Sequence, residues 1–238
     1  VIHEGGHALY ELHTGRELAR SNLGTGVSMG IHESQSRFYE NIIGRSRAFC
    51  SIIYPWLKEH FAPRLDHVTE DDFYRMINKS EPSLIRTEAD ELTYCLHIMV
   101  RYELEKRMFD GSLTAHDLPA EWNRLYKEYL GIDVPDDRQG VLQDSHWANG
   151  NIGYFPSYAI GSAYGAQYLQ EMSRDLDVDA VVRSGDLTPI NNWLEDRIWK
   201  HGCMKDPVAL FESVCGKFDP ACYVAYLEKK FTEVYGLS

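Results

Sequence analysis

Apolar side chains recur along most of the chain at the three- and four-residue spacing of an amphipathic helix, and alternating runs are short and few. Pro55 predicts a bend in the longest such stretch. Thr69 before three acidic residues and Gly131 after an apolar run are typical of helix ends. We expect helices over 34–60, from 69 onward, and over 84–109, 117–131, 158–174, 189–201, 207–215 and 220–235. With one short strand expected over 27–31, the chain is predicted to be mainly α with at most a short β segment.

Composition narrows the class of protein. The 238 residues are 44% hydrophobic and 25% charged, as in an ordinary globular domain, and the pattern indicates one mainly α domain. The net charge of −12 opposes binding to nucleic-acid phosphates. Apolar runs stay well short of the roughly 20 residues that span a bilayer, so no membrane partner is expected. The chain opens at Val1 without a lead-in, which indicates the downstream part of something longer.

Five cysteines are widely spaced, at positions 50, 95, 203, 215 and 222, and form no C-x-x-C pair. This usage is typical of free thiols in a reducing compartment, so a cytoplasmic protein is expected.

The first chemical signal is H-E-x-x-H at His3-Glu4-Gly5-Gly6-His7. Residues four apart share one face of a helix, so both imidazoles can reach one metal ion, and Glu4 lies where it can take a proton from water. In a chain of this composition, chance produces the pattern about 0.03 times. Two adjacent glycines cost a helix about 1 kcal/mol each, which indicates close packing against this turn or passage of a substrate. The alternative is a pair of solvent-facing histidines at a helix end.

Two histidines need a third ligand to form a catalytic zinc site, and a carboxylate is the common choice. Glu33 follows a glycine-rich segment, 24–30, that lets the chain turn back so that a following helix faces the first. Two alternatives stay open at this point. Glu33 can instead be an acid that stabilises a helix N-terminus, and the adjacent His32 is a rival ligand.

Four separated motifs together resemble the carboxypeptidase Taq family of zinc metallopeptidases. They are H-E-G-G-H at 3–7, H-E-S-Q at 32–35, I-R-T-E-A-D at 85–90 and G-V-L-Q-D-S-H-W at 140–147, and the segment 153–158 is also similar. The resemblance implies a multi-helix fold with a long active-site groove, removal of C-terminal residues from peptides, and a homodimer. It also implies that residues 1–238 are the C-terminal catalytic portion of a longer enzyme whose N-terminal helices are absent.

The resemblance assigns His3, His7 and Glu33 as metal ligands and Glu4 as catalytic base. A carboxypeptidase also needs a cation for the substrate's free carboxylate, and the planar fork of an arginine suits it. We assign that role to Arg86, whose alternative is a surface ion pair with Glu88 or Asp90.

Further roles are expected for residues of the later motifs. Asp90 and Asp144 are candidates for the carboxylate that accepts the second N–H of a metal-bound histidine. His146 and Tyr158 are expected to contact the substrate or the oxyanion, and Tyr154 to bind substrate, against the alternative of a packed aromatic cluster. Of these aromatic residues, Tyr154 and Trp147 fit that packed cluster better.

Zinc is the expected metal, although the same ligands also accept cobalt, manganese or nickel. Two rival functions remain. One is another H-E-x-x-H metallopeptidase, either an endopeptidase or an aminopeptidase. The other is an inactive metal-binding or dimerisation fragment, because the helix that carries His3 lacks preceding turns.

Overall fold

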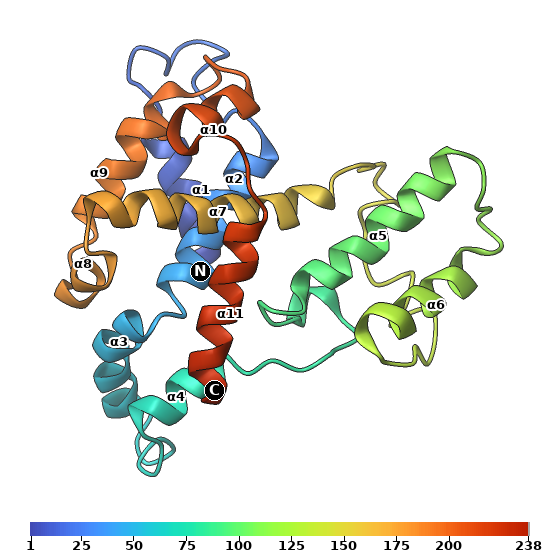
Figure 1. Ribbon diagram of the computed structural model, residues 1–238, viewed down its shortest axis with the longest axis horizontal. Helices are drawn as coiled ribbons and strands as arrows, with labels where there is room; N and C mark the ends of the chain where they lie inside the picture. The colour runs from blue at the N-terminus through green and yellow to red at the C-terminus, as the bar shows by residue number, and fades with distance from the viewer. Residues whose placement is uncertain (238) are drawn as a thin grey trace. The chain divides into compact units, whose positions relative to one another are not determined.

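The computed structural model describes residues 1–237, and over this range the regular secondary structure is helical throughout (Figure 1). The elements are α1 (Ile2–Leu12), α2 (Met29–Arg37), η1 (Phe38–Ile43), α3 (Arg47–His60), α4 (Glu70–Ile77), η2 (Arg86–Glu88), α5 (Tyr94–Phe109), α6 (Leu118–Leu130), α7 (Pro156–Asp175), α8 (Val178–Ser184), α9 (Thr188–Arg197), η3 (Trp199–His201), α10 (Pro207–Cys215) and α11 (Ala221–Tyr235). The predicted mainly α fold is therefore confirmed. Among the described helices, none is long and apolar enough to cross a membrane.

The chain divides into two compact units. The first joins Val1–Asn78 to the segment that starts at Ile160, and the second is Lys79–Ala159. In the first unit α1 packs against α2 and η1, and its main core gathers Tyr10, Phe38, Tyr168 and Trp199 among others. In the second unit α5 packs against α6, shown in green in Figure 1, around Trp122 and other buried side chains.

The segment 27–60 differs from its prediction in two respects. The expected strand over 27–31 is wrong, because the Ser28 hydroxyl accepts a hydrogen bond from the Ile31 amide and starts α2 at Met29. The expected single helix over 34–60 is also wrong. The π-helical turn η1 ends at Gly44, whose amide donates to the Tyr39 carbonyl, and the Ser46 hydroxyl starts α3 anew.

Elsewhere the local signals are mostly confirmed. Thr69 and Asp72 form a capping box at the start of α4, and Gly131, at φ +72°, ends α6. The predicted helix over 84–109 starts late, at Tyr94, because Asp90 accepts hydrogen bonds from the Leu92 and Thr93 amides and sets the helix start. Helix α8 has no counterpart among the predicted elements.

Candidate metal centre

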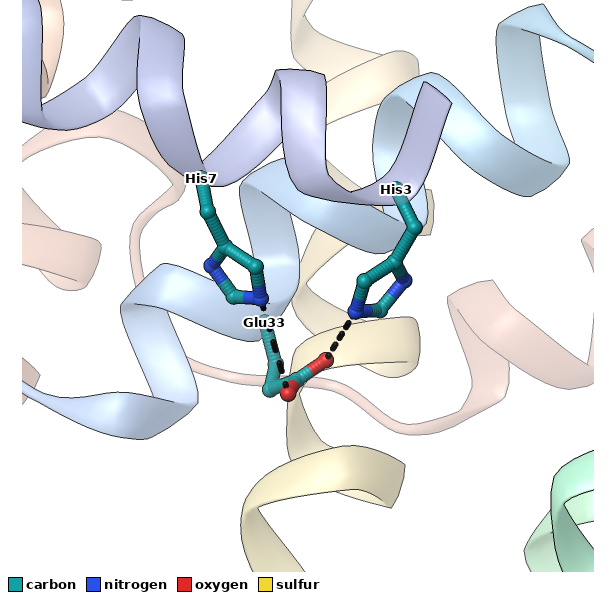
Figure 2. Close-up of side chains that lie close together, drawn as sticks. All are labelled: His3, His7 and Glu33. Atoms are coloured by element: carbon teal, nitrogen blue, oxygen red, sulfur yellow. Dashed lines mark ion pairs between the residues drawn. The ribbon is translucent and has the colours of Figure 1, made fainter. Parts of the chain in front are cut away.

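Helices α1 and α2 of the first unit bring three candidate ligands together (Figure 2). His3 and His7 lie one turn apart on α1 and point toward Glu33 of α2. His3 Nε2 lies 3.7 Å from Glu33 Oε2, and His7 Nε2 lies 3.8 Å from Glu33 Oε1. One potential ligand atom from each of the three residues lies within 4.8 Å of the other two.

The donor set fits a divalent cation. The separations are too long for hydrogen bonds and slightly exceed the ~3.3 Å between ligand atoms of a tetrahedral zinc site. Glu33 is only 2% exposed, and burial raises the pKa of its carboxyl, so a cation would relieve the cost of its charge. Burial, with the nearby His3 and His32, lowers the pKa of His7 to about 4. His7 is therefore neutral at pH 7, the form in which an imidazole binds a metal.

The remaining nitrogens of both histidines have partners in the same unit. His3 Nδ1 lies 2.8 Å from Glu40 Oε2, and His7 Nδ1 lies 3.0 Å from His32 Nδ1. His32 Nε2 in turn lies 2.6 Å from Glu11 Oε1.

The structure places Asp90 and Asp144, the two carboxylates predicted to serve the histidines, in other contacts. Asp90 accepts hydrogen bonds from Ser80 and from the start of α5, and Asp144 is bound by two arginines, so both carboxylates are engaged within the second unit. The carboxylate that contacts His3 is Glu40, and Glu11 is linked to His7 through His32. Helical spacing was the available signal, because Glu40 follows Glu33 by seven residues and Glu11 follows His7 by four. His32, the rival ligand, lies behind His7 as its hydrogen-bond partner.

The two glycines of H-E-G-G-H differ in their surroundings. A β-carbon at Gly6 would lie 2.6 Å from the Gln35 carbonyl oxygen, whereas one at Gly5 would meet nothing within 4 Å. Gln35 is itself held by a buried hydrogen bond of 2.8 Å from the Trp199 indole. Gly6 therefore allows α1 to approach α2 closely, while Gly5 faces open space. Glu4, between the ligands, is exposed.

The second unit gathers a separate set of predicted residues. Arg86 is buried and donates through Nε and Nη2 to Asp144 Oδ1, at 3.0 and 2.8 Å, and through Nη1 to the Tyr94 hydroxyl. Its partner is thus Asp144 rather than Glu88 or Asp90. Arg101 Nε donates to the other Asp144 oxygen at 2.6 Å. Although burial opposes it, the two guanidinium groups hold the pKa of Asp144 below its usual range.

Aromatic residues surround this ion pair. The Tyr158 hydroxyl lies 3.1 Å from His146 Nε2, and the Tyr158 ring lies 4.9 Å from the Arg86 guanidinium carbon. Tyr154 packs against both His146 and Tyr158. Burial and the charge of Arg86 lower the pKa of His146. The Trp147 indole donates to Glu105, which agrees with a packing role for that residue.

A hollow in the first unit lies away from this centre. Its volume is about 1110 Å³, and it is lined by residues of η1, α7, α8 and α11, among other segments. It contains none of the predicted site residues, so the side-chain chemistry, rather than cavity size, identifies the candidate centre.

The chain is similar to proteins of one metallopeptidase family. The family described as Carboxypeptidase Taq (M32) metallopeptidase matches residues 1–231. The chain is 46% identical to Carboxypeptidase 1 of Bacillus subtilis (strain 168) over 237 residues, which is 99% of this chain and 47% of the relative. It is 44% identical to Thermostable carboxypeptidase 1 of Thermus thermophilus, covering 99% of this chain and 46% of the relative.

A solved structure is similar as well. The crystal structure of the M32 carboxypeptidase from Deinococcus radiodurans R1 superposes with a TM-score of 0.96 at 40% identity, over 99% of this chain and 48% of that one. The chain thus spans about half the length of the curated relatives it matches.

Proposed function

Because the chain belongs to the carboxypeptidase Taq (M32) metallopeptidase family, we propose that it is the metal-binding part of an enzyme that removes C-terminal residues from peptides. The convergence of His3, His7 and Glu33 carries the proposal. A family of metallopeptidases implies a divalent metal, and we propose zinc, with cobalt or manganese as substitutes.

The three converging residues would hold the metal. When bound there, a divalent ion lowers the pKa of water and polarises a carbonyl group. Glu4 then accepts the proton of the attacking water and passes it to the amine that leaves. Exposure of Glu4 on α1, one residue from His3, leaves its carboxylate accessible to that water.

Arg86 is proposed to bind the C-terminal carboxylate of the substrate. Two guanidinium groups, those of Arg86 and Arg101, share the single carboxylate of Asp144, so this trio carries one net positive charge. A buried excess of positive charge favours an anion. Within the same cluster, His146 and Tyr158 are proposed to donate hydrogen bonds to the substrate or to the oxyanion, and Tyr154 to contact the substrate.

The oligomeric state and cellular location are also proposals. The family resemblance supports a homodimer, which light scattering on the full chain tests directly. The five cysteines, all free in the structure, support a cytoplasmic protein.

The test is to incubate the full chain with an unblocked peptide and to follow the products by mass spectrometry, with and without a chelator. We expect single residues to be lost from the C-terminus, and this loss to stop on chelation. Internal cuts or N-terminal trimming would instead indicate another type of metallopeptidase. Metal binding without cleavage would indicate a non-catalytic fragment.

A further inference from the structure

A chain of three side chains leads away from the candidate metal centre inside the first unit. His7 Nδ1 lies 3.0 Å from His32 Nδ1, and His32 Nε2 lies 2.6 Å from Glu11 Oε1. The same Glu11 oxygen accepts hydrogen bonds from the Thr25 hydroxyl and the Gly26 amide, both at 2.9 Å. These bonds connect Glu11 to the loop that precedes α2.

These contacts allow one placement of the N–H hydrogens on the two imidazole rings. His7 turns Nε2 toward Glu33, and a nitrogen that binds a metal carries no hydrogen, so the hydrogen of His7 sits on Nδ1. His32 Nδ1 must then accept it. A neutral imidazole that accepts at Nδ1 carries its hydrogen on Nε2, which is the nitrogen facing the Glu11 carboxylate. A doubly protonated His32 would place two N–H groups against each other.

We propose that His32 and Glu11 are positioning residues that fix the tautomer and the ring orientation of His7 for metal binding. The inference rests on the proposed metal site. His3 reaches a carboxylate directly, through Glu40, which Arg37 Nη1 also binds at 3.2 Å. His7 instead reaches the Glu11 carboxylate through a second imidazole, that of His32. His3 and His7, both on α1, are therefore oriented by different kinds of hydrogen-bond partner.

The packing around His32 supports this role. Its ring centroid lies 4.7 Å from that of Tyr10, which is fully buried, and a β-carbon on Gly26 would collide with its Nε2. Both contacts pack closely against the ring of His32, which supports a fixed position of Nδ1 beside His7.

The test measures Zn²⁺ affinity of the full chain by competition with a chelator. His32→Phe keeps a ring but removes both nitrogens, and we expect Zn²⁺ to bind at least about 10-fold more weakly. His32→Asn restores an acceptor near the position of Nδ1, and we expect it to recover affinity to within about threefold of the wild type. His13→Phe is the matched control, because His13 directly follows α1 and, within residues 1–237, its ring forms a hydrogen bond to the Leu9 carbonyl through Nδ1. It should leave Zn²⁺ affinity unchanged.

A second measurement determines which ring nitrogens of His7 and His32 carry a hydrogen. In the Zn²⁺-loaded wild type, ¹⁵N–¹H correlation spectra should show His7 protonated at Nδ1 and His32 protonated at Nε2 only. Hydrogens on both nitrogens of His32, or equal Zn²⁺ affinities for His32→Phe and wild type, would overturn the inference while leaving the proposed peptidase intact. Conversely, the expected affinities without C-terminal trimming would support the inference and contradict the proposed function. A wild-type chain that binds no Zn²⁺ would contradict both.

Discussion

Gly161 of α7 packs directly against the side chain of Glu33, so that a β-carbon at position 161 would collide with the Glu33 β-carbon. Both residues belong to the first unit, and Gly161 and Glu33 are both buried. Glu33, whose carboxylate faces His3 and His7, thus packs against the backbone of Gly161, where there is no room for a side chain. The position of this candidate ligand depends on α7, which lies more than a hundred residues away in sequence.

Gly161→Ala is expected to displace Glu33 and to weaken Zn²⁺ binding by about 10-fold or more. A small displacement of a ligand atom from its proper position weakens its bond to the metal considerably. Gly165→Ala on the same helix is the matched control. A β-carbon there meets its nearest neighbours at 3.5 Å, an ordinary contact, so affinity should stay unchanged and helix stability should rise by up to about 1 kcal/mol. Equal Zn²⁺ affinities for the two variants would contradict the support role of Gly161.

Gly6→Ala and Gly5→Ala form a second matched pair. We expect Gly6→Ala to push α1 away from Gln35 and to destabilise the protein by about 1–3 kcal/mol, as overpacking does. Gly5→Ala fills open space and should stabilise α1. Thermal unfolding of the two variants checks this order, and the reverse order would show that the approach of α1 to α2 does not need Gly6.

Glu4→Gln is expected to retain the metal and to lose turnover by about 10²- to 10⁴-fold, because the amide cannot accept the water proton. Metal content by elemental analysis and kcat on an unblocked peptide are measured on the same preparation. Loss of metal together with activity would make Glu4 a structural residue rather than the base.

Arg86→Ala should abolish the preference for a peptide with a free C-terminal carboxylate over the same peptide amidated at its C-terminus. The neutral amide offers no charge to the guanidinium, so only the free acid loses binding. The readout is the ratio of kcat/KM for the two peptides. Arg107→Ala is the control, because Arg107 forms an ion pair with Glu121 in the same unit and has no proposed role. An unchanged ratio in Arg86→Ala would exclude Arg86 as the carboxylate anchor.

His97 predicts a pH dependence of stability. It is fully buried in the second unit, and burial, together with Arg101 and Arg86, lowers its pKa to about 3. The unfolded chain binds a proton at about pH 6.5 and the folded chain does not until about pH 3, so falling pH favours unfolding across this window. From pH 7 to pH 5 this group should cost about 2 kcal/mol of unfolding free energy.

The matched variant for this effect is His97→Phe, which keeps the ring and removes the titration. Urea unfolding of both proteins at about pH 7, 6 and 5 measures the difference in free energy. We expect the gap between wild type and variant to change by about 2 kcal/mol in favour of the variant as the pH falls. A constant gap would mean that His97 binds its proton equally in both states.

Local signals predicted much of the helical structure. The Thr69 capping box, Gly131 and the proline at the start of α10 act on neighbouring amides and carbonyls, so their effect does not depend on distant residues. The sequence-based prediction was wrong where two local signals favour different structures. Apolar spacing over 34–60 favoured one helix, but Ser46 starts a new one. The segment 27–31, with glycines around it, favoured a strand, but within residues 1–237 it has no partner strand, which a sheet requires.

The sequence by itself determined the family and the candidate site residues: the two histidines one turn apart, the acid between them and the motif that carries Glu33. Helical periodicity places such residues on one face whatever the rest of the chain does. Tertiary structure alone decided which side chains contact these candidate ligands. Glu40 reaches His3 from a π-helical turn, His32 and Glu11 reach His7, and Gly161 leaves space for Glu33. Those contacts depend on how helices far apart in sequence pack, and packing is set by the shapes of both surfaces together rather than by either sequence segment alone.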